Sequence, residues 1–113
     1  MSLRGTVLAL VLAASPGLAW ADAAAEARGH AVFDRWCGLC HAPGPLMAGN
    51  IALNEKYKGA KPVELERRTD LTPEIVKSYA RRGANYMPRF RKTEISDAEL
   101  DDVAAYLTRT DRR

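Results

Sequence analysis

The chain has 113 residues, a length that fits one domain. Lysine and arginine together number 17 against 14 aspartate and glutamate residues, which gives a formal net charge of +3 at pH 7. This small excess argues against a partner such as nucleic acid, which requires a concentrated basic stripe. The chain has two cysteines, and both lie in one short motif, so cysteine chemistry is expected at a single place.

The first 21 residues have the pattern of a secretory signal peptide. A short charged start precedes an apolar run at residues 7–14, and residues 19–21 read Ala-Trp-Ala, an A-x-A cleavage pattern. The run is too short for a membrane span, and a Ser-Pro-Gly sequence interrupts it, which disfavours an uncleaved anchor helix. We therefore expect residues 1–21 to be removed. Residues 22–113 would then form a periplasmic domain without a membrane span.

Residues 37–41 read Cys-Gly-Leu-Cys-His, the C-x-x-C-H spacing of a c-type haem attachment site. Two thiols at this spacing can each form a thioether with one vinyl group of the porphyrin, and the following imidazole becomes the proximal iron ligand. We therefore predict one covalent haem c, bound through Cys37 and Cys40, with His41 as axial ligand. Three alternatives stay open at this point: a dithiol redox centre, part of a zinc site, or a disulfide.

The residues before this motif predict an amphipathic helix over residues 23–36. Gly29, Val32, Phe33 and Trp36 are spaced at i, i+3, i+4 and i+7, which places them on one helical face. A glycine within a helix costs about 1 kcal/mol relative to alanine. Gly29 on the buried face therefore suggests that another element approaches closely there.

Two further helices have clear start signals. Thr72 as N-cap and Pro73 at the first helical position predict a helix that Gly83 ends. Ser96 and Glu99 form a capping box, which predicts a last helix extending to about residue 108. A shorter helix is expected over residues 62–68, and no convincing alternating strand pattern occurs. The fold class is therefore predicted to be all-α.

The segment between His41 and Pro62 is expected to be rich in loops, because prolines and glycines occur throughout it. A proximal histidine usually donates its second ring N–H to an oxygen that fixes the orientation of the imidazole. The carbonyl of Pro45 is a plausible acceptor for His41. The alternative is that residues 42–45 form a plain turn.

A sixth iron ligand is predicted at Met87. Two methionines follow the signal peptide, and Met47 lies too near His41 in the sequence to reach the opposite face of a haem without a very tight path. Met87 follows a helix and lies in a loop that contains proline, from which it can reach that face. The alternative for Met87 is a core-filling role. His30 is expected to be a surface residue.

These features resemble class I cytochromes c, and the resemblance covers essentially the whole mature sequence. It rests on Gly29 and Phe33, on the Cys37–His41 motif with Gly-Pro after it, on Tyr-Met-Pro around Met87, and on Ala-Tyr-Leu in the last helix. The resemblance implies three to four helices wrapped around one covalently attached haem. It also implies that the first and last helices cross where Gly29, Phe33 and Tyr106 meet, and that the Pro45 carbonyl orients His41.

A finer resemblance concerns residues 87–100. Met-Pro-Arg-Phe-Arg-Lys followed by Ser-Asp-Ala-Glu-Leu is similar to the small cytochrome subunits of bacterial flavocytochromes that oxidise alkylphenols, of the p-cresol methylhydroxylase type. It implies a flavoprotein dehydrogenase as redox partner. Basic residues flank Met87 and are expected either to steer an acidic partner or to form a solvated face: Arg81, Arg82, Arg89, Arg91 and Lys92.

The function predicted from these residues is one-electron transfer rather than catalysis. With His41 and Met87 both bound, the iron has no open position for a substrate. A free-standing cytochrome that serves another dehydrogenase or an oxidase is the main alternative. A haem enzyme or sensor with a displaceable Met87, and a haem-free thiol–disulfide oxidoreductase, are the others.

Overall fold

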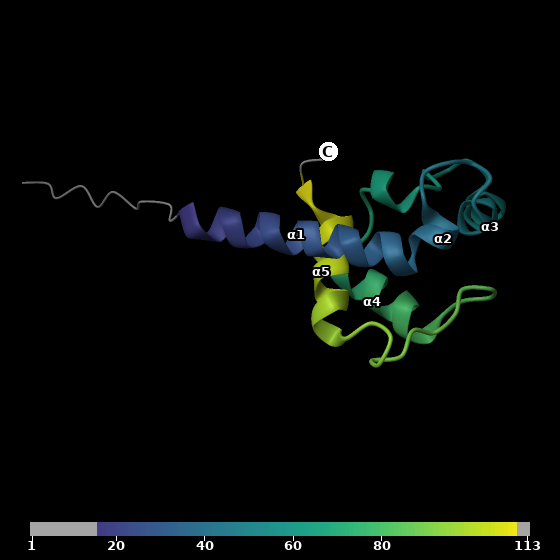
Figure 1. Ribbon diagram of the computed structural model, residues 1–113. Coiled ribbons are helices and arrows are strands. Elements are labelled where there is room, and N and C mark those ends of the chain that lie inside the picture. Colours follow the sequence, from purple (N-terminus) through teal and green to yellow (C-terminus); the bar gives the residue numbers. More distant parts are fainter. Residues whose placement is uncertain (1–15, 111–113) are drawn as a thin grey trace, which may run out of the picture.

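The computed structural model describes residues 16–110 of the chain (Figure 1). No strand occurs in this range, so the all-α prediction is confirmed. Most of the expected signal peptide, residues 1–15, lies outside the described residues. The elements in chain order are α1 (Pro16–Trp36), α2 (Gly38–His41), α3 (Ala48–Tyr57), the 3-10 helix η1 (Leu65–Arg67), α4 (Pro73–Arg82) and α5 (Asp97–Thr108).

The first helix is longer than predicted. It was expected to begin at Ala23, but α1 begins at Pro16 and continues without a break to Trp36. Proline fits the start of a helix because its missing N–H needs no partner there, and the alanine-rich residues that follow have high helix propensity. None of the helices in residues 16–110 combines the length and the apolar character that crossing a membrane requires.

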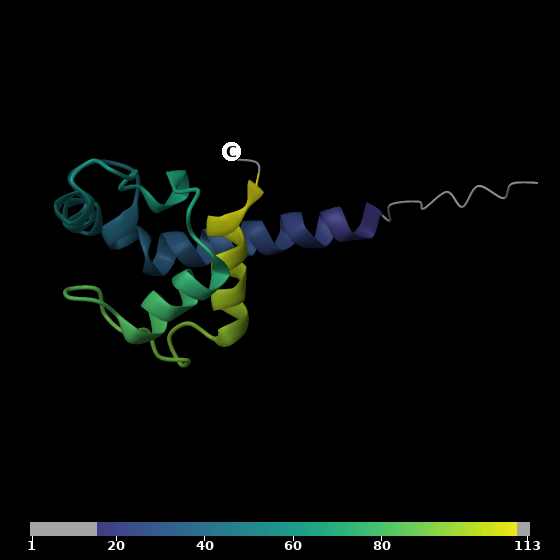
Figure 2. The ribbon, with the colours of Figure 1, turned by 180° about the vertical axis from the view of Figure 1, so that it is seen from behind.

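Helix α5 crosses α1 at Gly29, and Figures 1 and 2 show this crossing from opposite sides. A Cβ atom added to Gly29 would lie 2.0 Å from the Asp102 carbonyl oxygen and 2.8 Å from the Tyr106 Cβ. The ring centroids of Phe33 and Tyr106 are 5.7 Å apart, and Phe33 is buried. The expected meeting of Gly29, Phe33 and Tyr106 at the crossing of the terminal helices is therefore confirmed.

Two small apolar clusters extend from this crossing. One joins α1 to the C-terminal half of α5, and the other joins α4, residue 95 and the start of α5 to α1. The buried members of the first are Phe33, Val103, Tyr106 and Leu107, and those of the second are Ala80, Ile95 and Leu100. Helix α4 is thereby fixed to the same body as the crossing.

The predicted caps of the last two long helices are present. The Thr72 hydroxyl accepts a hydrogen bond of 3.3 Å from the Ile75 N–H, Pro73 is the first residue of α4, and Gly83 ends that helix. Ser96 and Glu99 form the full capping box at the start of α5. Both helix starts follow from local hydrogen bonding, which is why the sequence predicts them well.

The loop prediction between His41 and Pro62 is wrong for residues 48–57, which form α3. Gly49 and Asn50 suggested a turn, but both lie within the first turn of this helix. Most of the residues after them have good helix propensity, and Lys58 ends the helix in the left-handed conformation at φ 49°. Residues 62–68, expected to be a short helix, contain only the three-residue η1.

The far end of α3 is attached to the body by polar and cation–π contacts. The guanidinium of Arg68 lies 4.8 Å from the Tyr57 ring centroid and pairs with Asp70 at 2.7 Å. Lys56 donates a hydrogen bond of 3.4 Å to the hydroxyl of Tyr79 on α4. Apart from these contacts, α3 packs mainly on α2.

Gly29→Ala should destabilise the protein. The added methyl group would overlap the backbone of α5, which cannot move without separating the two helices. We expect a loss of about 2 kcal/mol in the free energy of unfolding, although alanine is the better helix former. Denaturant unfolding of the haem-loaded protein measures this loss. The exposed Ala31, changed to serine on the same helix, should cost less than about 1 kcal/mol, and an equal cost would show that the close contact at Gly29 is unimportant.

Candidate haem site

The motif of residues 37–41 lies at the junction between α1 and α2. The Cys37 N–H donates to the Phe33 carbonyl at 2.8 Å, so the chain leaves α1 with its last helical hydrogen bond intact. The His41 N–H then donates to the Cys37 carbonyl at 2.8 Å. This single turn gives Cys37, Cys40 and His41 a fixed relative placement.

Cys37 and Cys40 form no disulfide within residues 16–110, and both are half-buried. Burial raises the pKa of Cys37 to about 11, and the neighbouring Cys40 adds to this effect. A dithiol redox centre depends on the opposite shift, because its attacking cysteine must be a thiolate near neutral pH. The environment of Cys37 therefore favours the haem interpretation over the dithiol interpretation.

The His41 imidazole is held against the start of α3. A Cβ atom added to Gly49 would lie 2.5 Å from His41 Cε1 and 2.6 Å from its Nδ1. Burial lowers the pKa of His41, and the nearby Asn50 opposes this with a smaller effect. A lowered pKa keeps the ring neutral at physiological pH, which is the form that binds a metal.

Asn50 is buried and connects α3 to the loop that follows His41. Its Nδ2 donates hydrogen bonds to the carbonyl of Ala42 at 3.0 Å and to that of Gly44 at 2.7 Å. Within residues 16–110, two buried side-chain polar atoms have no hydrogen-bond partner, and these are Asn50 Oδ1 and His41 Nδ1. His41 Nδ1 thus forms no hydrogen bond in the structure, and the role expected for the Pro45 carbonyl stays a prediction.

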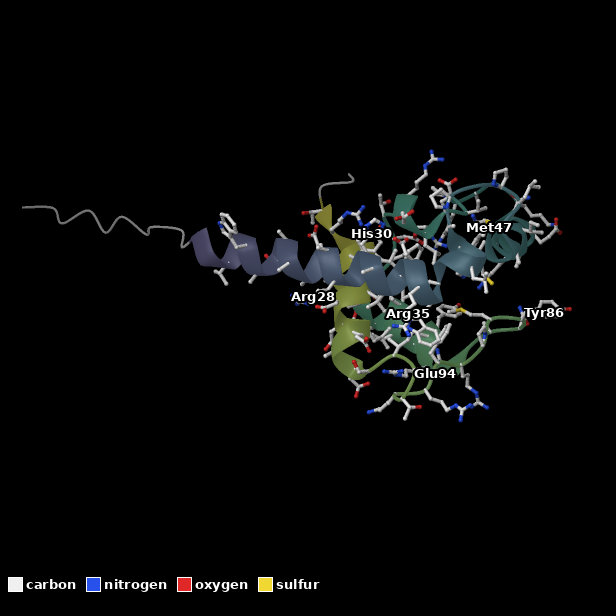
Figure 3. All side chains as sticks on the ribbon, in the orientation of Figure 1. Arg28, His30, Arg35, Met47, Tyr86 and Glu94 are labelled. Atoms are coloured by element: carbon white, nitrogen blue, oxygen red, sulfur yellow. The ribbon has the colours of Figure 1, made fainter. Side chains whose placement is uncertain are left out.

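Met87 lies on a tight turn at the same end of the molecule as α2 and α3, and the tip of this turn is marked by Tyr86 in Figure 3. Ala84 and Met87 exchange backbone hydrogen bonds of 3.2 and 2.8 Å across the turn. The Met87 side chain is half-buried, whereas Tyr86 is 99% exposed. The Phe90 N–H donates to the Ala80 carbonyl at 2.9 Å, which ties the turn back to α4.

The remaining sequence candidates lie in different surroundings. Met47, half-buried, immediately precedes α3 on the His41 side of the site (Figure 3). The Pro45 side chain is exposed. His30 stacks on Tyr106 with ring centroids 4.8 Å apart, and it is a surface residue as expected. Across residues 16–110, no three His, Cys, Asp or Glu side chains gather into a possible metal site.

The site has the apolar surface that a haem needs. Several large apolar side chains on the elements around it are exposed to solvent, and a haem bound between these elements could cover them. These side chains, 39–99% exposed, are Leu39, Leu46, Ile51, Ile75, Tyr79 and Tyr86. Together with two free thiols and an imidazole whose Nδ1 edge faces α3, they fit a covalently attached haem.

Two residues of the site were not recognised from the sequence. Gly49 and Asn50 lie in the segment expected to be rich in loops, although Gly49 permits the contact with the His41 ring and Asn50 lies beside that ring. The available signal was their position eight and nine residues after His41, followed by a helix-forming run. Their contacts depend on tertiary structure, so the sequence pattern alone does not reveal them.

Comparisons with known proteins agree with this site. Residues 24–107 match the family described as cytochrome C oxidase, cbb3-type, subunit III. The chain is also 30% identical, over 112 residues, to the cytochrome c subunit of 4-cresol dehydrogenase (hydroxylating) from Pseudomonas putida, covering 96% of this chain and 81% of that protein. No solved structure matches the chain. Both alignments span the Cys-x-x-Cys-His motif and the helices around it.

Gly49→Ala tests the packing of α3 on the His41 ring. The new methyl group would overlap Cε1 and Nδ1, so the ring or the helix must shift. We expect the free energy of unfolding of the haem-loaded protein to fall by about 1–3 kcal/mol, and the ferric absorption spectrum to gain a high-spin component. The matched change is Ala52→Ser at an exposed position of the same helix. Identical spectra and stabilities for both variants would contradict the close packing.

Proposed function

This chain belongs to the cytochrome c family, and from that premise we propose that His41 and Met87 ligate its haem iron and that a flavoprotein dehydrogenase supplies its electrons. Membership in the family makes it an electron-transfer protein with one covalent haem c. The axial ligands, the periplasmic location and the partner are the proposed parts. The relative from Pseudomonas putida is the cytochrome c subunit of a dehydrogenase, which supports a similar assembly here.

The observation that carries the proposal is the placement of two half-buried cysteines and a histidine around one turn of helix. When bound, the haem supplies a couple that accepts and releases one electron. Cys37 and Cys40 fix it covalently, and His41 presents Nε2 because its Nδ1 edge faces α3. Met87 would supply a thioether as the second protein ligand, which would leave the iron without an open position for a substrate and would favour the reduced state relative to a second histidine.

Exposed charge near Met87 supports docking with an acidic partner. Arg81 and Lys92 pair with Asp97 at 2.8 and 2.7 Å, so their charges are partly neutralised. Arg82 and Arg89 are exposed and form no ion pair with any residue in the range 16–110. These two arginines, beside the fully exposed Tyr86, are suited to steer an acidic surface towards this end of the molecule.

The substrate class proposed for the assembly is a 4-alkylphenol. The name of the relative specifies 4-cresol as what its dehydrogenase acts on, and oxidation of a cresol releases electrons that a cytochrome subunit can accept one at a time. A second candidate is a role with a terminal oxidase, which the description of the matched family favours. In both cases the chain transfers electrons and leaves bond chemistry to its partner.

Met87→Ala tests the sixth ligand. Loss of the thioether should abolish the weak charge-transfer band at the red end of the ferric spectrum and should produce a high-spin form, because residues 84–90 contain no other methionine, histidine or cysteine. Met47→Ala is the matched control and should keep the band. Retention of the band in Met87→Ala, or its loss in Met47→Ala, would contradict the assignment.

A reconstituted complex tests the partner. We expect the native protein to co-purify with a flavin-containing subunit, and the haem to be reduced when 4-cresol is added to that complex under anaerobic conditions. In the double variant Arg82→Glu with Arg89→Glu, association should slow by about tenfold at low ionic strength, with a smaller effect at high salt. Arg67→Glu, on the exposed η1, is the control. If 4-cresol leaves the haem oxidised, the alkylphenol assignment is wrong.

A further inference from the structure

The amide orientation of Asn50 is determined by its surroundings. A hydrogen-bond donor must face the carbonyl oxygens of Ala42 and Gly44, and the only donor in the side chain is Nδ2. Oδ1 must therefore point in the remaining direction. It lies at 0% exposure without a partner, and a buried acceptor left unsatisfied is destabilising.

The second unpartnered atom lies next to the same segment. The Gly49 contact shows that the Nδ1 edge of His41, rather than its Nε2 edge, faces the first turn of α3. Asn50 is the next residue in that turn. His41 Nδ1 on α2 and Asn50 Oδ1 on α3 are thus both buried, and neither has a hydrogen-bond partner in the structure.

We infer that Asn50 Oδ1 accepts a hydrogen bond from His41 Nδ1–H and thereby sets the tautomer and the orientation of the proximal imidazole. The inference rests on the proposed function, since it takes His41 as the iron ligand. Asn50 is a positioning residue that acts through His41. It takes the place in this chain that the sequence suggested for the Pro45 carbonyl.

The bond has consequences for the redox couple. A proton fixed on Nδ1 leaves the Nε2 lone pair directed away from α3, which is the geometry that iron binding needs. An acceptor on Nδ1–H also makes the imidazole a stronger donor of electron density to the metal. Stronger donation favours the ferric state and lowers the reduction potential.

The experiment uses the haem-loaded protein with ¹⁵N-labelled histidine. In the ferrous, diamagnetic form we expect a His41 Hδ1 signal whose exchange with solvent is at least tenfold slower in the native protein than in Asn50→Leu. Asn50→Asp keeps an acceptor oxygen but loses both donations from Nδ2, so the signal should stay protected in this variant. Asn54→Leu, an exposed position on α3, is the matched control and should behave as the native protein does.

The reduction potential provides the second readout. Asn50→Leu should shift the ratio of reduced to oxidised protein at a fixed potential by about tenfold towards the reduced form, which corresponds to about 59 mV for one electron. Equal exchange of Hδ1 in the native protein and in Asn50→Leu would overturn the inference and return the role to a backbone carbonyl. Loss of protection in both Asn50→Leu and Asn50→Asp would also overturn it, because it would show that the donations from Nδ2 matter instead.

These outcomes are separable from failure of the proposed function. If no covalent haem spectrum appears, or if the Met87 variant shows that the axial ligands are different, the function fails before Asn50 is tested. If the haem is attached with the expected ligands and the Asn50 variants match the control, only the inference fails. Should Asn50→Leu not fold, the Hδ1 signal of the native protein and its nuclear Overhauser contacts to the Asn50 amide still decide the question.

Discussion

The close contact between α1 and α5 at Gly29 is the constraint on which the rest of the structure depends. Because Gly29 has no side chain, the backbones of α1 and α5 lie so close together that a methyl group at this position would overlap the Asp102 carbonyl. This crossing orients the C-terminal end of α1, from which the Cys37–His41 turn projects. Because α4 packs on α5, the same crossing also positions the turn that carries Met87. Two segments 46 residues apart in sequence are thus directed to one end of the molecule (Figures 1 and 2).

The sequence predicted best those features whose signals are local. Thr72 and Ser96 cap their helices through hydrogen bonds to residues three positions away, and Gly29 with Phe33 gave the buried face of α1. It failed for α3, because Gly49 was weighed as a turn residue. The helix forms there since its later residues favour it and since α2 offers a surface on which it packs. Tertiary contacts of this kind leave no periodic pattern in a single sequence.

The haem expected from the family completes the apolar packing that the helices lack around the site. Helix α3 is joined to α4 chiefly by a hydrogen bond between Lys56 and Tyr79, and large apolar side chains such as Leu39 and Ile51 are exposed. A domain of about 100 residues buries little more than 60% of its unfolded surface, so it has little apolar packing to spare. Covalent attachment through Cys37 and Cys40 would add a rigid apolar body beside these exposed side chains.

Asn50 shows how one buried side chain can link the binding motif to the rest of the fold. Its two donations hold the loop after His41 to α3, and its buried oxygen is available for the hydrogen bond inferred from His41. A backbone carbonyl in that position would accept a hydrogen bond equally well, but that hydrogen bond would be lost only if the loop moved. A single point mutation can replace the Asn50 side chain, and it can thereby change the reduction potential of the haem. The orientation of His41 is then determined by α3, the helix that the sequence did not predict.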